Sequence, residues 1–86
     1  MKLTYSNHFK KRLKKQLKQN PQIRSKIHRQ LLFLQTDTRH PSLKMHKLKG
    51  ERLDQFAIWI EGNIRITFII VDGVALLTDI IRHDEY

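Results

Sequence analysis

The stretch FAIWIEGNIRITFIIVDGVALLTDIIR, residues 56–82, contains the most regular pattern of this chain. Apolar side chains alternate with other residues in three successive runs, which is typical of strands with one buried face. Glu61 to Asn63 separates the first two runs, and Asp72-Gly73 separates the last two. Because Asp and Gly both tolerate a positive φ, Asp72-Gly73 predicts a two-residue hairpin turn that pairs Val71 with Val74.

This turn also sets the expected register of the sheet. Counted back along the strands, it pairs Arg65 with Ile80, so Arg82 is expected on the same face as Arg65. A three-residue turn in the preceding hairpin places Trp59 beside Arg65 on this open face. The other face is expected to pack on helices and carries the alternate apolar residues, which are Phe56, Ile58, Ile60, Ile64, Ile66, Phe68, Ile70, Leu77 and Ile81.

The residues before this sheet have a helical pattern. A short strand is expected at residues 2–5, followed by a helix with Ser6 or Asn7 as its N-cap. Apolar residues spaced by four form one stripe of this amphipathic helix, and they are Phe9, Leu13 and Leu17.

A second helix is expected to begin at Asn20-Pro21, with Asn20 as N-cap and proline at the first helical position. Its apolar stripe consists of Ile23, Ile27, Leu31 and Leu34. Residues 35–53 show no periodicity and are expected to form a basic loop. The predicted fold is therefore α+β, β-α-α-β-β-β, with two antiparallel helices on one face of a small antiparallel sheet. Residues 1–86 form a single domain in this interpretation.

The charge of the chain is strongly asymmetric. It contains 17 Lys and Arg against 8 Asp and Glu, and 15 of the basic residues fall within residues 1–52. Such a surface favours a polyanion, because binding releases condensed counterions. A basic surface that only confers solubility, or one that attracts anionic lipid, is the alternative. The absence of cysteine excludes disulfides and cysteine-based zinc sites.

The first residues lack the apolar region of a signal peptide, and the longest apolar stretch is too short to span a bilayer. We therefore expect a cytoplasmic protein that does not insert into a membrane.

Cleavage of RNA by its own 2′-hydroxyl requires a base, an acid and cations that stabilise the phosphate. Histidine suits both proton transfers because its pKa lies near neutrality, and the arginine fork matches phosphate oxygens. The candidate catalytic residues are Arg65, Arg82, His83, Tyr86 and His46. No histidine pair has metal-ligand spacing, so neither metal nor cofactor is expected.

Each candidate also has a purely structural interpretation. Arg65 fits a solvated strand residue, and His83 fits a residue at a frayed strand end. His46 fits a phosphate contact as well as a proton carrier. Trp59 fits either a stacking platform for a base or a cover over one end of the sheet. The remaining histidines, His8, His28 and His40, are expected at the surface.

The open face of the sheet is also expected to present apolar residues, namely Ile69, Val71, Val74, Leu76 and Ile80. A small monomer rarely exposes a patch of this size, so a partner protein or self-association is expected to cover it. The alternative is that residues 35–53 pack on it.

Four short segments together resemble the RelE/ParE superfamily of toxins from bacterial toxin–antitoxin modules. These segments are residues 1–6 (MKLTYS), 46–50 (HKLKG), 64–68 (IRITF) and 82–86 (RHDEY). The resemblance implies two helices against an antiparallel sheet and an endoribonuclease that cuts mRNA in the ribosomal A site. It also implies a cognate antitoxin that holds the enzyme inactive in a heterotetramer or larger complex.

The resemblance assigns roles to individual residues. Arg65 matches the strand arginine that contacts the scissile phosphate. Arg82 and His83 fall where members place a phosphate-binding arginine or a general acid or base. Tyr86 matches a terminal aromatic that stacks on or activates the substrate, and His46 matches a loop histidine that is catalytic in one subgroup.

Two departures favour a histidine-centred mechanism, since Ala57 and Trp59 stand where the best-known members have strand lysines. Members that inhibit DNA gyrase are the main alternative, and a basic nucleic-acid-binding module without toxicity is another. The residues expected to hold RNA, besides Trp59, are Lys10, Lys11, Lys14, Lys44, Lys47 and Lys49.

Overall fold

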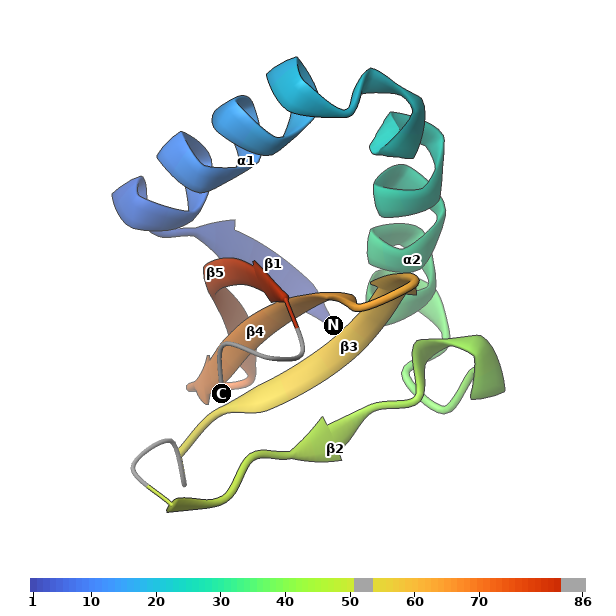
Figure 1. Cartoon of the computed structure of the whole chain (residues 1–86). Helices are drawn as coiled ribbons and strands as arrows, with labels where there is room; N and C mark the ends of the chain where they lie inside the picture. The colour runs from blue at the N-terminus through green and yellow to red at the C-terminus, as the bar shows by residue number, and fades with distance from the viewer. Residues whose placement is uncertain (51–53, 83–86) are drawn as a thin grey trace.

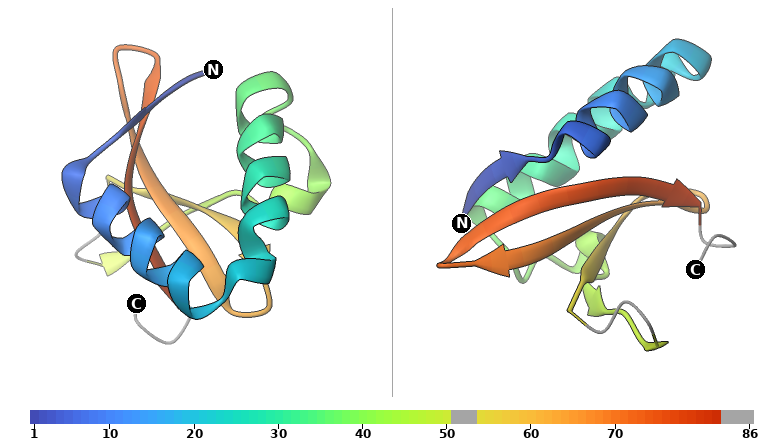
Figure 2. Two further views of the ribbon diagram at one scale, coloured as in Figure 1. Left: turned by 90° about the horizontal axis from the view of Figure 1, so that it is seen from above. Right: turned by 90° about the vertical axis from the view of Figure 1, so that its left-hand side faces the viewer.

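The structure is a computed structural model that describes residues 1–50 and 54–82. Two α-helices lie on one face of a five-stranded sheet, which confirms the predicted α+β class and element order (Figures 1 and 2). In chain order the elements are β1 (Lys2–Tyr5), α1 (Asn7–Gln19), the 3₁₀ turn η1 (Pro21–Ile23), α2 (Arg24–Thr36), the 3₁₀ turn η2 (Pro41–Leu43), β2 (His46–Lys47), β3 (Phe56–Glu61), β4 (Ile64–Val71) and β5 (Val74–Arg82).

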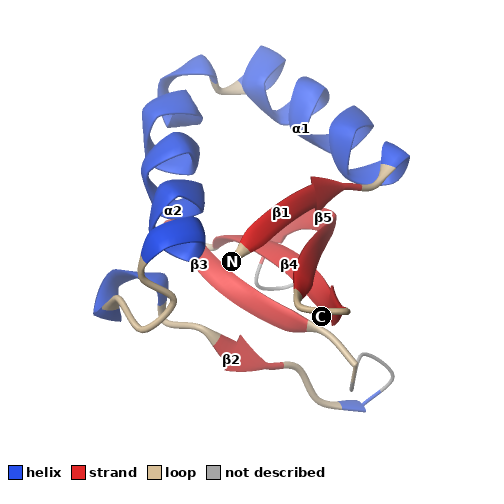
Figure 3. Ribbon diagram, turned by 180° about the vertical axis from the view of Figure 1, so that it is seen from behind, coloured by secondary structure: helices blue, strands red, loops and turns tan. Residues whose placement is uncertain are grey.

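The strands lie in the order β1-β5-β4-β3-β2. Strand β1 runs parallel to β5, and the other neighbouring strands are antiparallel, so the sheet is mixed and not purely antiparallel as expected. A parallel neighbour requires a long crossover connection, and both helices belong to it. The segment expected to be loop contributes η2 and the short edge strand β2 (Figure 3).

Helix α1 begins as predicted, because the Ser6 side chain accepts a hydrogen bond from the backbone N–H of Phe9 at 3.0 Å. The predicted start of the second helix is wrong. Pro21 begins a 3₁₀ turn and α2 starts at Arg24, while the side chain of Asn20 makes no capping hydrogen bond. The two helices run out and back along the sheet but diverge in a V (Figure 2). No helix in the described ranges is long and apolar enough to cross a membrane.

The main core lies between these helices and the sheet. Both predicted helical stripes contribute to it, and Phe9, Ile23 and Leu34 are completely buried. The sheet supplies the inward-facing residues, which are Ile58, Ile60, Ile66, Phe68, Ala75, Leu77 and Ile80.

The Asp72-Gly73 turn forms as predicted, with φ of 52° and 78°, and it pairs Val71 with Val74. The register counted from it is wrong beyond Leu77, because the pairing shifts by one residue at Thr78.

Past this bulge Arg65 pairs with Ile81, and Arg82 pairs with Ile64. Directly paired residues share a face of a sheet, so Arg65 and Arg82 lie on opposite faces. The two isoleucines also exchange places relative to the prediction: Ile80 joins the core under the helices and Ile81 lies on the other face.

Hydrogen bonds hold the extra residue in place. The Thr78 hydroxyl lies 2.8 Å from the buried Thr67 hydroxyl and donates to Gln55 Oε1 at 2.8 Å. The Thr78 carbonyl accepts from the Ser6 hydroxyl at 3.3 Å, which links the bulge to the start of α1. Bulges of this kind bend a strand and increase its twist.

Beyond Leu77, β5 has no pairing with β1, and α1 binds this free edge instead. Arg12 Nε lies 3.1 Å from Asp79 Oδ1, and Arg12 Nη2 donates to the Ile80 carbonyl at 3.0 Å. His8 Nε2 lies 3.3 Å from the second carboxylate oxygen of Asp79. In residues 1–50 and 54–82, both ion pairs therefore involve this one carboxylate.

Replacing Asp79 with alanine should lower the free energy of unfolding by about 2 kcal/mol, because it removes the charged acceptor that holds α1 against β5. Urea denaturation would measure this change. The control Asp54→Ala removes an exposed carboxylate of the same type and should change stability by less than about 0.5 kcal/mol. An equal free energy of unfolding for the two variants would show that Asp79 does not stabilise the packing of α1 against β5.

Candidate nucleic-acid interface

The face of the sheet opposite the helices carries three of the predicted site residues. Trp59 pairs directly with Arg65, and His46 pairs with Ala57, two residues before Trp59 in β3. Since paired residues share a face and strand residues two apart also share it, His46, Trp59 and Arg65 lie together there. The predicted placement of Trp59 beside Arg65 is confirmed, but the predicted three-residue turn is wrong. Glu61 pairs with Ile64 across a two-residue turn, and a register shift between Trp59 and Glu61 restores the pairing of Trp59 with Arg65.

The β3–β4 turn anchors both Trp59 and Arg65. The Gly62 carbonyl accepts from Trp59 Nε1 at 2.9 Å and from Arg65 Nη1 at 2.9 Å. Arg65 Nη1 also donates to the Ile64 carbonyl at 3.2 Å. A guanidinium has five N–H donors, so this arrangement orients the group and leaves donors for a ligand. Within the described ranges no carboxylate pairs with Arg65, so its charge remains available to an anion.

Lys44 connects the preceding loop to this pair. Its backbone is left-handed, with φ of 46°, and its Nζ lies 4.9 Å from the centre of the Trp59 ring, within the range of a cation–π contact. The Lys44 carbonyl lies 3.1 Å from His46 Nδ1. Because a carbonyl only accepts, Nδ1 carries the proton in this contact, and Nε2 of the neutral ring is left able to accept one.

A buried glutamine supports the loop that carries these residues. Gln30, on α2, is 1% exposed and donates through Nε2 to the Trp59 carbonyl at 2.8 Å and to the Ser42 carbonyl at 3.0 Å. The Ser42 hydroxyl lies 2.8 Å from His40 Nδ1, and the His40 ring stacks on Phe33 with centroids 3.7 Å apart. The predicted surface role of His40 is thus wrong, since its half-buried ring forms part of this support.

Gln30, His40 and Ser42 have no place in the sequence-based site. One signal for Gln30 is present in the sequence, because position 30 lies on the same helical face as Ile23, Ile27 and Leu34. A glutamine among buried apolar residues indicates an amide with hydrogen-bond partners inside the fold.

Other predicted site residues lie elsewhere. Arg82 shares the face of Ile64, under the helices. The exposed lysines of α1, Lys10, Lys11 and Lys14, lie on the helix side of the sheet, away from Arg65. In the edge strand, Lys47 pairs with Phe56 and so points to the helix side, while Lys49 is exposed beyond it. His83 and Tyr86 lie outside the described residues.

The apolar patch predicted on this face loses Ile80, which lies in the core, while Ile69, Val74 and Leu76 are half-buried. Elsewhere on this face Leu48, Ala57 and Ile81 are each at most 4% exposed although they lie outside the main core. Exposed apolar residues instead concentrate at the end of the β4–β5 hairpin, where Ile70 is 45% and Val71 is 49% exposed. Ile70 lies on the helix-side face as predicted, because it pairs with the buried Ala75, but near the tip of the hairpin it is exposed.

The chain matches solved structures of bacterial toxins along almost its whole length. A mutant of YafQ from E. coli has a TM-score of 0.81 and 16% identity, over 96% of this chain and 93% of that chain. A copper-bound mutant toxin from Helicobacter pylori has a TM-score of 0.78 and 20% identity, over 99% and 97%. The YoeB–YefM complex from Staphylococcus aureus has a TM-score of 0.76 and 18% identity, over 96% and 97%.

No protein-family model and no curated protein matches the chain. The structural likeness shows that the chain shares the fold of these toxins, which is the fold expected from the sequence.

The support from Gln30 can be tested with Gln30→Leu, which keeps the side-chain size but leaves the Ser42 and Trp59 carbonyls without this donor. We expect the free energy of unfolding to fall by about 2 kcal/mol or more, because partly buried acceptors lose their hydrogen bonds. Urea denaturation followed by the fluorescence of Trp59, the single tryptophan, would measure this. Gln22→Leu replaces an exposed glutamine and serves as control. Equal urea midpoints for the two variants would show that Gln30 does not stabilise the loop.

Proposed function

We propose that this protein is the toxin of a toxin–antitoxin pair and a metal-independent endoribonuclease that cuts mRNA on the ribosome. The observation that carries the proposal is the grouping of His46, Trp59 and Arg65 on one face, with Lys44 over the Trp59 ring. This group combines a proton acceptor, an arginine and a stacking surface, the residue types that RNA cleavage requires. The shared fold with YafQ and YoeB toxins supports it.

In this mechanism His46 Nε2 removes the proton of the 2′-hydroxyl, and the 2′-oxygen attacks the adjacent phosphorus. Arg65 stabilises the added negative charge on the phosphate oxygens, since its guanidinium is already oriented by the Gly62 carbonyl. The bond to the 5′-oxygen breaks, and this leaving oxygen takes a proton from the general acid. A 2′,3′-cyclic phosphate and a free 5′-hydroxyl result.

His83 and Tyr86, which lie outside the described residues, keep the roles proposed from the sequence. His83 supplies the proton to the leaving oxygen, and Tyr86 positions the nucleotide. Arg82 contacts the RNA backbone from the end of β5 and not from beside Arg65, because the Thr78 bulge places it on the other face.

The ribosome and an antitoxin are the proposed partners. Lysines on α1 bind ribosomal RNA, on the side of the sheet away from the reacting phosphate. The exposed Ile70 and Val71 at the hairpin tip suit an apolar contact with the antitoxin. Support comes from the solved complexes DinJ–YafQ and YoeB–YefM, in which proteins of this fold bind a partner. A cytoplasmic location follows from this function.

Cleavage can be tested by adding purified protein to a cell-free translation reaction with a defined mRNA and mapping 5′ ends by primer extension. Arg65→Ala should slow the appearance of new ends about 100- to 1,000-fold, as loss of one oriented donor does elsewhere. His46→Ala should also slow it, because the 2′-hydroxyl loses its base. The control Arg29→Ala removes an exposed arginine of α2 and should leave cleavage unchanged.

New ends are expected only when ribosomes translate the message. If the wild-type protein leaves the mRNA intact, the ribonuclease proposal is wrong, and inhibition of gyrase supercoiling becomes the next assay.

The role of α1 predicts a change in salt dependence. A triple variant with Lys10, Lys11 and Lys14 replaced by alanine should bind ribosomes with a log–log salt slope smaller by roughly 2 to 3, since each lost phosphate contact removes about 0.7–0.9. A matched variant on α2, with Arg24, Lys26 and Arg29 replaced by alanine, carries the same change of charge. Equal slopes for the two variants would indicate attraction by net charge and not by the α1 surface.

A further inference from the structure

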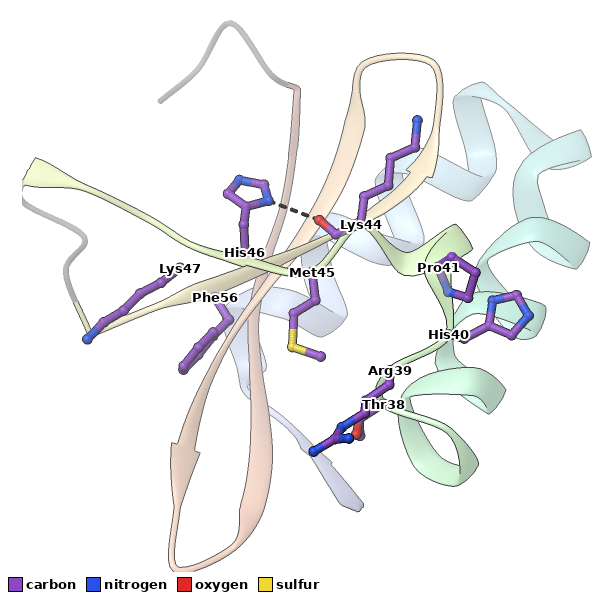
Figure 4. Close-up of a pocket in the computed structure, with 9 residues that line it drawn as sticks. All are labelled: Thr38, Arg39, His40, Pro41, Lys44, Met45, His46, Lys47 and Phe56. Atoms are coloured by element: carbon purple, nitrogen blue, oxygen red, sulfur yellow. Dashed lines mark hydrogen bonds between the residues drawn. The ribbon is translucent and has the colours of Figure 1, made fainter.

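An opening beside the site lies at the edge of the sheet. A cavity of about 470 Å³ lies between η2 and the edge strand β2, with Phe56 of β3 in its wall (Figure 4). Pockets of this order bind one small organic ligand or one residue of a polymer. None of Thr38, Arg39, Met45 and Phe56, which line it, belongs to the site proposed from the sequence.

The chemistry of the wall is that of a nucleotide site. Arg39, Lys44 and Lys47 provide positive charge, and no carboxylate is among the described residues that line the cavity. Met45 and Phe56 provide an apolar surface beside these charges. A phosphate binds to positively charged groups, and the flat face of an unpaired base stacks on an apolar surface.

The apolar wall is held by the core and is not a chance gathering of surface chains. Phe56 stacks on the buried Phe68, with ring centroids 5.5 Å apart, and also lines the cavity. Met45 also packs against the main core. On the far side, His40 is fixed between the Phe33 ring and the Ser42 hydroxyl. A ligand would therefore meet a surface that is already formed, which lowers the entropy cost of binding.

The cavity adjoins the proposed cleavage site. Figure 4 shows Lys44 and His46 pointing to one side of the segment that contains β2, while Met45 and Phe56 point to the other. Residues of both groups line the same cavity. An RNA chain with its reacting phosphate near His46 can therefore place a neighbouring nucleotide beyond the edge of β2.

We propose that this cavity binds one unpaired nucleotide of the RNA next to the cleaved bond, with its base against Phe56 and Met45 and its phosphate at Arg39 and Lys47. The proposal rests on the proposed ribonuclease function for the identity of the polymer. It assigns base preference at that position to the cavity, because an apolar wall of fixed shape discriminates between bases by size and stacking.

Binding can be tested without ribosomes by titrating ¹⁵N-labelled protein with each of the four nucleoside 5′-monophosphates and with inorganic phosphate. At least one nucleotide should shift the amide signals of residues 38–47 and 56. It should bind about tenfold or more tightly than phosphate, since only the nucleotide gains the base contact. No shift at millimolar nucleotide, or the same affinity for phosphate alone, would overturn the proposal.

Two variants locate the contact. Arg39→Ala should weaken nucleotide binding about tenfold, as expected for loss of a hydrogen bond to a charged group, whereas Arg29→Ala should not. Phe56→Leu should weaken binding of the nucleotide but not binding of phosphate. If this core-facing variant fails to fold, the result for Arg39→Ala decides the test by itself. Equal weakening by both arginine variants would show attraction by net charge only, which overturns the site.

The translation assay separates this inference from the proposed function. If the wild type leaves mRNA intact but binds nucleotide in the cavity, the proposed ribonuclease function is wrong and the proposed nucleotide site is supported. If Arg39→Ala and Phe56→Leu cut mRNA at the same positions and with the same base preference as wild type, the proposed nucleotide site is wrong and the ribonuclease proposal is supported.

Discussion

One extra residue in β5 determines how both sides of the sheet are built. The bulge at Thr78 reverses the facing of residues 79–82, so Ile80 enters the core and Ile81 lies beside Arg65 on the other face. Asp79, directly after the bulge, meets Arg12 of α1 at an edge where β5 has no partner strand. The attachment of α1 and the composition of the opposite face therefore depend on the same irregularity, and bulges beside functional sites commonly have this effect.

The distribution of carboxylates explains why one face of this basic protein remains available to an anion. In the described part of the chain, Asp79 makes both ion pairs, and it makes them with α1. Arg65 and His46 are instead oriented by backbone carbonyls, and the supporting residue Gln30 is a neutral amide. Neutral groups fix geometry without cancelling charge. A phosphate approaching this face therefore meets positive charge with which no carboxylate of residues 1–50 and 54–82 forms an ion pair.

Period-two and period-four patterns were sufficient to predict the α+β class, both helical stripes and the Asp72-Gly73 turn, because these depend on local sequence. The pairing of Trp59 with Arg65 was predicted from a three-residue turn, whereas the structure reaches it through a two-residue turn and a register shift between Trp59 and Glu61. The bulge was not predictable, because Thr78 is held by Thr67, Gln55 and Ser6, which are distant in sequence. The same limit applied to the support of the basic loop, which depends on contacts between α2, η2 and β3.

The parallel pairing of β1 with β5 has a consequence for how the protein acquires its fold during synthesis. The Ser6 hydroxyl bonds to the Thr78 carbonyl across 72 residues, and β1 pairs with residues 74–77. A ribosome makes β1 first and its partner strand much later, whereas the β4–β5 hairpin closes within a few residues. Contacts so distant in sequence slow folding and form after local ones. The nascent chain therefore lacks its finished sheet, and with it the completed face that carries Arg65, until nearly all of it has been translated.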